Sequence, residues 1–348
     1  MTQKPLLLDY SYEDLAALIK KMGEPSYRAQ QLWTALHRNH VSSVEQISTL
    51  SRNLRARLDQ DFEFQPLKVL KELHSSDGST RKALFNLPDG QAVESVFMLY
   101  HKRRTVCIST QVGCAMGCAF CATGQMGFQR NLSRGEIAAQ VYHYARELEQ
   151  SGDKLSNVVL MGMGEPFHNY EESIQAMELL NHADGLNLGA RRITVSTVGL
   201  VPQILRYTEE KHPYRLAISL HAATEELRTR LLPINRKYPL KDLLTACRNY
   251  VDQSGRRITF EWALIENVND TEEQLERLIA FAGDMLCHIN LIPLNSSPQS
   301  SYHRTSSSRV DQFEKALTEN NISCSVRLRR GLDIHAGCGQ LAVENKYS

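Results

Sequence analysis

Three cysteines, Cys114, Cys118 and Cys121, lie close together in a C-x-x-x-C-x-x-C pattern. Thiolates are soft ligands, so three of them on one loop can hold an iron-sulfur cluster. Three protein ligands leave one iron open to bind a substrate or cosubstrate directly. A structural zinc site is the alternative, but such sites take four protein ligands and show paired C-x-x-C elements. The sequence has no second pair, which favours the cluster, and Phe120 would either shield it or be ordinary core.

A further thiol, Cys338, lies between Gly337 and Gly339 close to the C-terminus. Neighbouring glycines predict a mobile and exposed backbone, which suits a sulfur that attacks another group or is itself modified. Cys107 has no such neighbours. By itself, its place in a strand-like run predicts an ordinary buried cysteine.

Strand-like and helix-like segments alternate from residue 105 onward. Strands are expected at 105–110, 157–163, 191–197, 214–220, 256–265 and 288–294, and helices at 134–149, 170–183, 201–211, 224–254, 271–285 and 308–320. The run 157–161 is apolar throughout, as in parallel strands covered on both faces. Six β/α units are fewer than the eight of a closed barrel, so the sequence predicts an α/β fold with an incomplete, TIM-like (β/α)6 barrel and an open side. A final strand is expected at about 323–329.

Polar and glycine residues follow several of these expected strands. They are Gly164 and Glu165 after the second strand, Ser196 after the third, Ser219, Leu220 and His221 after the fourth, and Asn295 after the sixth. Each one alone could belong to a tight turn or be a satisfied core residue. The C-terminal ends of parallel strands form one rim, where binding sites gather. Their shared place at this rim, beside the cysteine loop, predicts a common site.

Two smaller regions precede the barrel. Residues 11 to about 60 have helical spacing, with Ser11 and Asp14 in an N-capping pattern. Residues 67–100 form alternating runs separated by Asp77-Gly78 and Asp89-Gly90, which predicts a short antiparallel meander. We therefore expect an N-terminal helical accessory domain (1–62), an antiparallel β extension (63–104), the barrel core (105–330) and a C-terminal loop that carries Cys338 (331–348).

The composition is that of an ordinary globular protein, with 348 residues, 42% of them hydrophobic and 23% charged, and a net charge of +1. No run reaches the roughly 18 apolar residues of a membrane span, and the first residues lack a signal-peptide core. We expect a cytoplasmic protein whose cysteines are ligands, catalysts or core residues rather than disulfides. Local basic clusters, such as Lys102-Arg103-Arg104 and Arg327/Arg329-Arg330, would either grip a phosphate backbone or be solvated faces.

Three longer motifs resemble one enzyme family. They are Ser109-Thr110-Gln111-Val112-Gly113-Cys114, Met161-Gly162-Met163-Gly164-Glu165-Pro166 and Asp333-Ile334-His335-Ala336-Gly337-Cys338-Gly339-Gln340-Leu341. Together with the cysteine pattern, they resemble the RlmN/Cfr family of radical S-adenosylmethionine (SAM) RNA methyltransferases over nearly the whole chain. Glu165-Pro166 resembles the sequence at this position in the family members that methylate adenine C2. The members that methylate C8 usually have another residue in place of the proline. Gly337 stands where alanine is more common, beside a retained Cys-Gly-Gln-Leu core.

The resemblance implies one 4Fe-4S cluster on Cys114, Cys118 and Cys121, and SAM contacts from the rim residues named above. It implies two SAM molecules per turnover. One methylates Cys338, and the other, on the open iron, is cleaved to a 5′-deoxyadenosyl radical that takes a hydrogen from the new methyl group. The carbon radical then adds to adenine and forms a protein-RNA crosslink. Radical chemistry is required because adenine C2 is electrophilic and offers no lone pair to an ordinary methyl donor.

The resemblance also implies RNA binding by the N-terminal helical domain, and two further residue roles. Glu94, in Val93-Glu94-Ser95-Val96, matches the base that removes the ring hydrogen, and partial burial in an apolar strand would raise its pKa. Without the resemblance, Glu94 would be an outward-facing strand residue. Cys107 matches the resolving thiol, which forms a transient disulfide with Cys338. The expected activity is methylation of adenine C2 in 23S rRNA, at the peptidyl-transferase centre, and in tRNA beside the anticodon.

Other activities remain open at this point. They are C8 methylation, a radical-SAM reaction on a small molecule or peptide, and a zinc-stabilised RNA-binding or redox-sensing protein. The basic clusters and Cys338 argue against a small-molecule substrate. The expected partners are 23S rRNA, tRNA and an electron donor such as a flavodoxin or ferredoxin, with no membrane, and the expected oligomeric state is a monomer.

Overall fold

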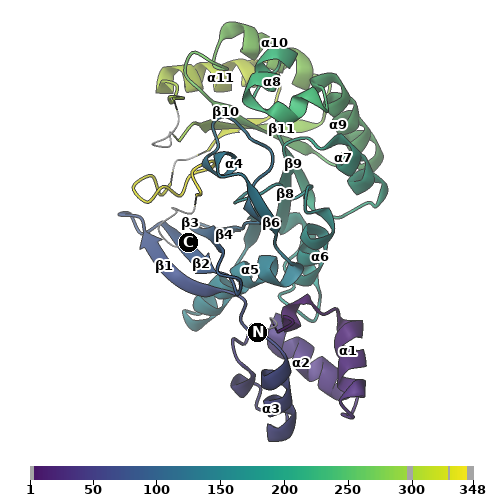
Figure 1. Ribbon diagram of the computed structural model, residues 1–348. Helices are drawn as coiled ribbons and strands as arrows, with labels where there is room; N and C mark the ends of the chain where they lie inside the picture. Colours follow the sequence, from purple (N-terminus) through teal and green to yellow (C-terminus); the bar gives the residue numbers. More distant parts are fainter. Residues whose placement is uncertain (1–3, 296–300, 328–329, 343–348) are drawn as a thin grey trace.

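The N-terminal region is helical in the computed structural model, which describes residues 4–295, 301–327 and 330–342 (Figure 1). Its elements are η1 Leu7–Asp9, α1 Tyr12–Lys21, α2 Tyr27–His37, η2 Val44–Gln46 and α3 Arg52–Asp61. The Ser11 hydroxyl accepts a hydrogen bond from the Asp14 N–H, and the Asp14 carboxylate accepts one from the Ser11 N–H. The predicted helices and their capping pattern are confirmed.

An antiparallel meander follows. Its strands are β1 Lys68–His74, β2 Thr80–Asn86 and β3 Ala92–Tyr100, and they turn at the two Asp-Gly pairs. Strand β4, Arg103–Cys107, pairs antiparallel with β3 and parallel with β7, Asn157–Leu160. The meander and the barrel strands therefore share one ten-stranded sheet, in the order β1-β2-β3-β4-β7-β8-β9-β10-β11-β12.

The barrel strands run parallel to one another from β4 onward. After β7 come β8 Ile193–Thr197, β9 Arg215–Ser219, β10 Ile258–Leu264, β11 Cys287–Pro293 and β12 Cys324–Val326. The helices and turns between them are α5 Arg134–Gln150, α6 Tyr170–Asn181, η3 Ala190–Arg192, α7 Val201–Glu209, α8 Glu225–Leu231, η4 Pro233–Arg236, α9 Leu240–Ser254, α10 Glu272–Ala282 and α11 Ser307–Glu319. The predicted incomplete (β/α)6 barrel is confirmed. Strand β12 lies inside the range 323–329 expected for a final strand, and residues 328 and 329 of that range are outside the described part.

The helix expected at 224–254 is in fact two helices. Helix α8 ends at Leu231, the turn η4 begins at Pro233, and α9 follows Pro239. Proline has no N–H for a helical hydrogen bond, and its ring clashes with the preceding turn. The two prolines therefore divide a segment whose apolar spacing is helical throughout.

A second, small sheet was not predicted. Strand β5, Gln111–Gly113, pairs antiparallel with β6, Phe128–Asn131, and the short helix α4, Ala122–Gln125, lies between them. Segments of three or four residues are too short to show a periodic pattern. These elements frame the loop that carries the three cysteines.

The N-terminal helices pack against α5. The Gly135 N–H donates to Asp9 Oδ1 at 2.9 Å, and the Arg134 side chain donates to the Asp9 carbonyl at 2.6 Å. An added Cβ at Gly135 would lie 2.7 Å from Asp9 Oδ1, so this approach requires glycine. Farther along, the buried His37 Nδ1 lies 2.9 Å from the Tyr142 hydroxyl of α5.

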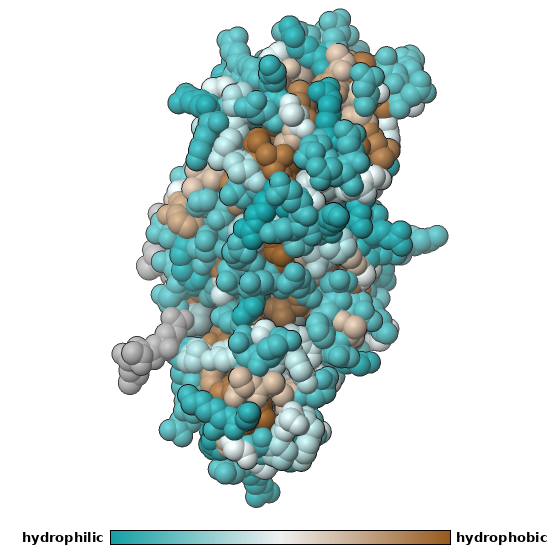
Figure 2. Space-filling model, turned by 90° about the vertical axis from the view of Figure 1, so that its right-hand side faces the viewer, coloured by the Kyte–Doolittle hydropathy of each residue, from teal (hydrophilic) through white to brown (hydrophobic). Residues whose placement is uncertain are grey.

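The surface is polar where Figure 2 shows it. Hydrophobic side chains on that side are scattered in small groups among hydrophilic ones. Within the described residues, no helix is both long enough and apolar enough to cross a membrane.

Candidate active site

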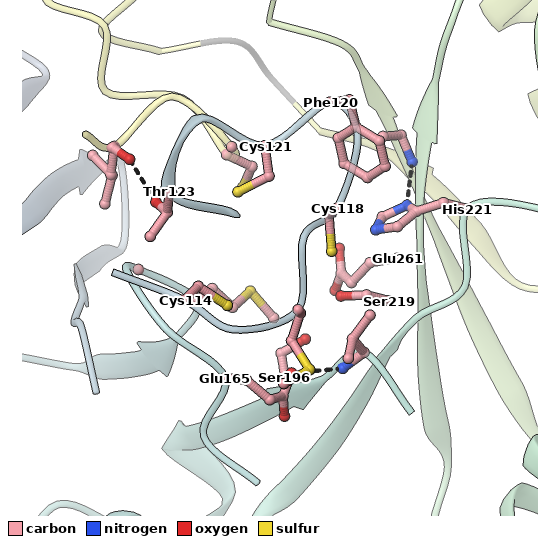
Figure 3. A pocket seen from close by; sticks show the side chains of 18 of the residues that line it. Cys114, Cys118, Phe120, Cys121, Thr123, Glu165, Ser196, Ser219, His221 and Glu261 are labelled. Atoms are coloured by element: carbon pink, nitrogen blue, oxygen red, sulfur yellow. Dashed lines mark hydrogen bonds between the residues drawn. The ribbon is translucent and has the colours of Figure 1, made fainter. Parts of the chain in front are cut away.

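The cysteine loop borders a cavity at the C-terminal ends of the barrel strands. Cys114, Cys118 and Cys121 all line this cavity, which is partly open to solvent. Figure 3 shows the three side chains around the same space. The Cys114 N–H donates to the Gly127 carbonyl at 2.9 Å, and the Cys121 N–H donates to the Cys118 carbonyl at 3.1 Å. The fold therefore gathers the three expected ligands on one fixed loop.

The chemistry of these thiols fits a metal cluster. Burial raises the pKa of all three, that of Cys114 to about 12, so on their own they would stay protonated at neutral pH. A bound cationic cluster supplies the positive charge that ionises coordinating thiols. Phe120 is buried beside the loop and lines the cavity, where its ring meets that of His221 edge-on at 5.0 Å.

Glu165 is a buried carboxylate at the same cavity. Its Oε2 accepts a hydrogen bond from the Val198 N–H at 2.8 Å, and its Oε1 accepts one from the Phe167 N–H at 3.0 Å. Burial nevertheless raises its pKa to about 7. The preceding Gly164 has φ of 100°, and a Cβ there would lie 2.6 Å from the Gln111 side chain. A ligand with a positively charged amino group would favour the ionised form of Glu165.

The remaining rim residues meet at this cavity with one exception. Ser196, Ser219, His221 and Asn295 line it together with Gly164 and Glu165. Leu220 does not, because its side chain is fully buried in the core. Its backbone N–H donates to a carbonyl of β10, so Leu220 holds the turn between two residues that line the cavity.

His221 is held as a neutral imidazole. Its Nδ1 accepts a hydrogen bond from the Ala263 N–H at 2.9 Å, and burial lowers its pKa to about 3. Its backbone has φ of 56°, and Asn269 supports the turn by donating to the His221 carbonyl at 2.7 Å. A neutral ring that accepts at Nδ1 carries its proton on Nε2. His221 can therefore donate a hydrogen bond from Nε2.

The C-terminal loop brings Cys338 to the same cavity. The Ala122 N–H donates to the Gly339 carbonyl at 2.8 Å, and the Thr123 hydroxyl donates to the Leu341 carbonyl at 2.5 Å. Both donors follow directly on the cysteine loop. The sequence predicts an exposed thiol at Cys338, whereas the structure shows a half-buried one on a docked loop.

Cys338 and Cys107 also share a second, adjoining cavity. Arg327 lines both cavities, and its Nη1 donates to the Cys338 sulfur at 3.4 Å. The same atom lies 3.9 Å from Glu261 Oε2. Burial raises the pKa of Cys107 to about 12, and the Arg327 charge acts in the opposite direction. The two thiols and the Arg327 guanidinium thus line the same cavity, and neither thiol forms a disulfide in this structure.

Glu94 lies on β3 and is not among the described residues that line either of these two cavities. Its Oε1 is 2.9 Å from Lys82 Nζ, and its Oε2 accepts a hydrogen bond from the Ala342 N–H at 3.0 Å. Glu94 is 6% exposed and Lys82 is 8% exposed. The structure therefore buries the expected base and balances its charge with a lysine.

Sequence reasoning did not single out Lys82 or Glu261, and it named Arg327 only as part of a basic cluster. Lys82 lies within β2 and Glu261 within β10, both in strands whose other residues are largely buried. Buried charges are rare unless they are paired. A charged residue within an otherwise apolar strand is therefore the sequence pattern that could have identified Lys82 and Glu261 as candidates.

The partial barrel, the three-cysteine loop and the cavity beside it define a radical-SAM enzyme. Residues 108–281 match the model of the radical SAM superfamily, and residues 6–64 match that of the ribosomal RNA large subunit methyltransferase N-terminal domain. Enzymes of this superfamily use SAM and a 4Fe-4S cluster with three cysteine ligands, and this chain uses the same cofactors.

Relatives that match nearly the whole chain identify the family within this superfamily. The chain is 47% identical to the probable dual-specificity RNA methyltransferase RlmN of Chloroflexus aurantiacus, over 97% of this chain and 92% of the relative. Its identity to the protein of the same name from Halalkalibacterium halodurans is 42%, over 98% and 94%. The crystal structure of a radical SAM methyltransferase from Sphaerobacter thermophilus aligns with a TM-score of 0.95 and 46% identity, over 97% of this chain and 99% of that one. The chain belongs to the RlmN family, which confirms the resemblance seen in the sequence.

Proposed function

We propose that this protein methylates carbon 2 of one adenine in 23S rRNA, at the peptidyl-transferase centre, and of an adenine beside the anticodon in tRNA. The observation that carries the proposal is the position of Cys338, which lines both the cavity of the cysteine loop and the cavity of Cys107. A sulfur in this position can take a group from SAM on one side and be attacked by a second thiol on the other. The name of the relatives, dual-specificity RNA methyltransferase, supports RNA as the substrate.

The cavity residues have distinct parts in this proposal. Cys114, Cys118 and Cys121 hold the cluster, which when bound supplies the electron for reductive cleavage of SAM. Glu165 binds the amino group of SAM as a carboxylate, and His221 donates from Nε2. The other contacts come from Gly164, Ser196, Ser219, the backbone of Leu220, and Asn295. Two SAM molecules are used in each turnover.

Cys338 accepts the methyl group of the first SAM. Its sulfur gives an electron pair to the methyl carbon, and the bond from that carbon to the SAM sulfur breaks, leaving S-adenosylhomocysteine. Arg327, at 3.4 Å, stabilises negative charge on the attacking sulfur. The methyl group would then lose a hydrogen atom to the 5′-deoxyadenosyl group of the second SAM, and its carbon would add to adenine C2. Return of one electron to the cluster would complete the link between the RNA and Cys338.

Glu94 and Cys107 complete the reaction. Glu94 takes the hydrogen of adenine C2 as a proton, and Cys107 attacks the Cys338 sulfur. The bond between that sulfur and the linking carbon breaks, and its electron pair stays on the carbon, which takes up a proton. This frees the methylated base and leaves a disulfide between the two cysteines. Reduction of the disulfide, and of the cluster, requires an electron donor such as a flavodoxin or ferredoxin.

The second cavity has residue types that suit RNA. Tyr100 and Arg330 line it, and two guanidinium groups lie close to the Tyr100 ring, with Arg330 at 4.5 Å and Arg103 at 4.9 Å from its centroid. Aromatic rings stack on unpaired bases, and arginines bind phosphates. These residues support a single-stranded or unfolded RNA segment as the group that enters beside Cys338.

The test is anaerobic reconstitution with iron and sulfide, followed by SAM, a reductant, and unmodified 23S rRNA or tRNA. Nucleoside mass spectrometry should find 2-methyladenosine in both RNAs. Detection of 8-methyladenosine instead would replace the proposal with C8 methylation. SAM cleavage with no methylated adenosine would overturn RNA methylation, and a colourless protein without iron would restore the zinc alternative.

A further inference from the structure

The loop that carries Cys338 is held by one ion pair at both of its ends. Lys82 Nζ donates to the His335 carbonyl at 3.3 Å, three residues before Cys338. Glu94 Oε2 accepts from the Ala342 N–H at 3.0 Å, four residues after it. Lys82 and Glu94 are themselves joined at 2.9 Å. Figure 1 shows this C-terminal loop, in yellow, near the meander.

The meander sets the positions of the two charged side chains. In the register of β2 and β3, Lys82 is opposite Val96 and Glu94 is opposite Leu84. Lys82 and Glu94 are therefore diagonal neighbours on the same face, a spacing that long side chains can bridge. Their side chains are only 10% and 8% exposed, and both contact the backbone of the loop.

Burial makes the ion pair and the loop depend on each other. A buried ion pair is stable only when its remaining hydrogen-bonding groups also find partners. The loop supplies two of these partners through its backbone, from His335 and Ala342. Removing one charge would break the ion pair and would release one end of the loop.

We propose that the Lys82–Glu94 pair is the clamp that places Cys338 for methyl transfer, and that Lys82 is a positioning residue of this reaction. The inference rests on the proposed function, since it assigns Cys338 the methyl-accepting role. It adds that Glu94 has two tasks. As a carboxylate it holds the loop through Ala342, and when it takes the proton of adenine C2 its charge is lost and its hold on Lys82 and Ala342 weakens. The loop is then released as Cys107 attacks Cys338.

Methylation of Cys338 can be measured in the absence of RNA, when no ring proton is removed. This measurement therefore tests the positioning of Cys338 separately from the action of Glu94 as a base. The reconstituted protein is mixed with methyl-labelled SAM, and the label on the peptide containing Cys338 is followed by mass spectrometry. Lys82→Met should slow labelling about tenfold or more, as expected for loss of a charge-assisted contact. Lys82→Arg, which keeps the charge and can reach both acceptors, should restore most of the rate. Lys71→Met, which removes an exposed lysine from the neighbouring β1, should behave as wild type.

Hydrogen exchange of the loop gives a second measurement that needs no activity. In the purified protein, peptides that cover residues 335–342 should exchange faster in Lys82→Met and in the nearly isosteric Glu94→Gln, while peptides from α5 stay protected. Iron content should be unchanged, so a general loss of folding would be recognised at once.

The two proposals fail in different ways. If wild-type Cys338 is never methylated, the proposed function is wrong, while loop exchange still tests the clamp. If wild-type Cys338 is methylated and Lys82→Met matches it in both labelling rate and loop exchange, the clamp is wrong. Failure of Lys82→Arg to restore the rate would likewise remove Lys82 as a positioning residue.

Discussion

Cys107 is the residue whose replacement should stop the reaction at its covalent intermediate. In Cys107→Ala the methyl group still reaches adenine through Cys338, but no thiol remains to attack the sulfur. We expect a protein-RNA adduct that migrates slowly on a denaturing gel, and at most one turnover per enzyme. Cys338→Ala is the matched control, because it keeps the cluster ligands but has no sulfur to methylate. An adduct in Cys338→Ala, or none in Cys107→Ala, would contradict these roles.

Glu165 should contribute to SAM binding through its charge. Glu165→Gln keeps the shape but removes the negative charge that faces the cavity, and its single amide oxygen can accept only one of the two backbone hydrogen bonds. A charge-assisted hydrogen bond contributes about 1.5–3 kcal/mol, so the Kd for SAM should rise about 10- to 150-fold. Equilibrium binding to the reconstituted protein measures this change. Glu171→Gln, at an exposed position on α6, serves as the control, and equal affinities would remove Glu165 from the SAM site.

At the scale of elements, the small β5–β6 sheet should fix the cysteine loop. Gly113 has φ of 72°, and an added Cβ would lie 1.9 Å from the Gly127 carbonyl oxygen, so β5 and β6 could not keep their spacing. We expect Gly113→Ala to lower the free energy of unfolding by about 2–4 kcal/mol and to reduce iron content. Urea denaturation and iron analysis are the measurements.

Gly152→Ala is a matched control for this effect. Gly152 has φ of 73°, but no atom lies within 4 Å of its added Cβ. Gly152→Ala should therefore lower the free energy of unfolding by only about 1 kcal/mol, the cost of a left-handed backbone at a residue with a Cβ, and should keep its full iron content. Equal losses in the two variants would mean that crowding between β5 and β6 is unimportant.

For the whole molecule, the buried contact between the N-terminal helices and the barrel should make stability depend on pH. Burial lowers the pKa of His37 to about 3 and that of His40 to about 4, although Glu149 lies 3.6 Å from His40. An unfolded histidine titrates near 6.5. The unfolded chain thus binds more protons than the folded chain below about pH 6.5, so stability falls as pH decreases from 6.5 toward 4.

The predicted slope is up to about 1.4 kcal/mol per pH unit for each of these imidazoles. Urea denaturation between pH 7.5 and 5 measures it. Replacing both His37 and His40 by glutamine should reduce the slope, whereas His74→Gln, at a 60% exposed position, should not. An unchanged slope in the double variant would show that other groups control the acid sensitivity.

Much of this protein could be predicted from sequence because the relevant signals are local. The cysteine spacing, the capping pattern at Ser11, the Asp-Gly turns and the apolar strand runs each depend on a few neighbouring residues, and the structure agrees with all of them. The division of the expected helix 224–254 was also visible in Pro233 and Pro239, but helical spacing outweighed them. The rim residues were predicted as a group because parallel strands end at the same edge of a sheet.

Other features were decided only by the tertiary structure. The pairing of β3 with β4 joins the meander to the barrel, and the sequence of neither strand indicates which strand it will pair with. The hold of the Lys82–Glu94 pair on both ends of the Cys338 loop, and the shared cavity of Arg327 and Cys107, join segments more than 200 residues apart. Local patterns set which residue types are present and how short segments fold. Long-range packing alone determines which charges become buried together, because the free energy of burying a charge depends on the partners that surround it.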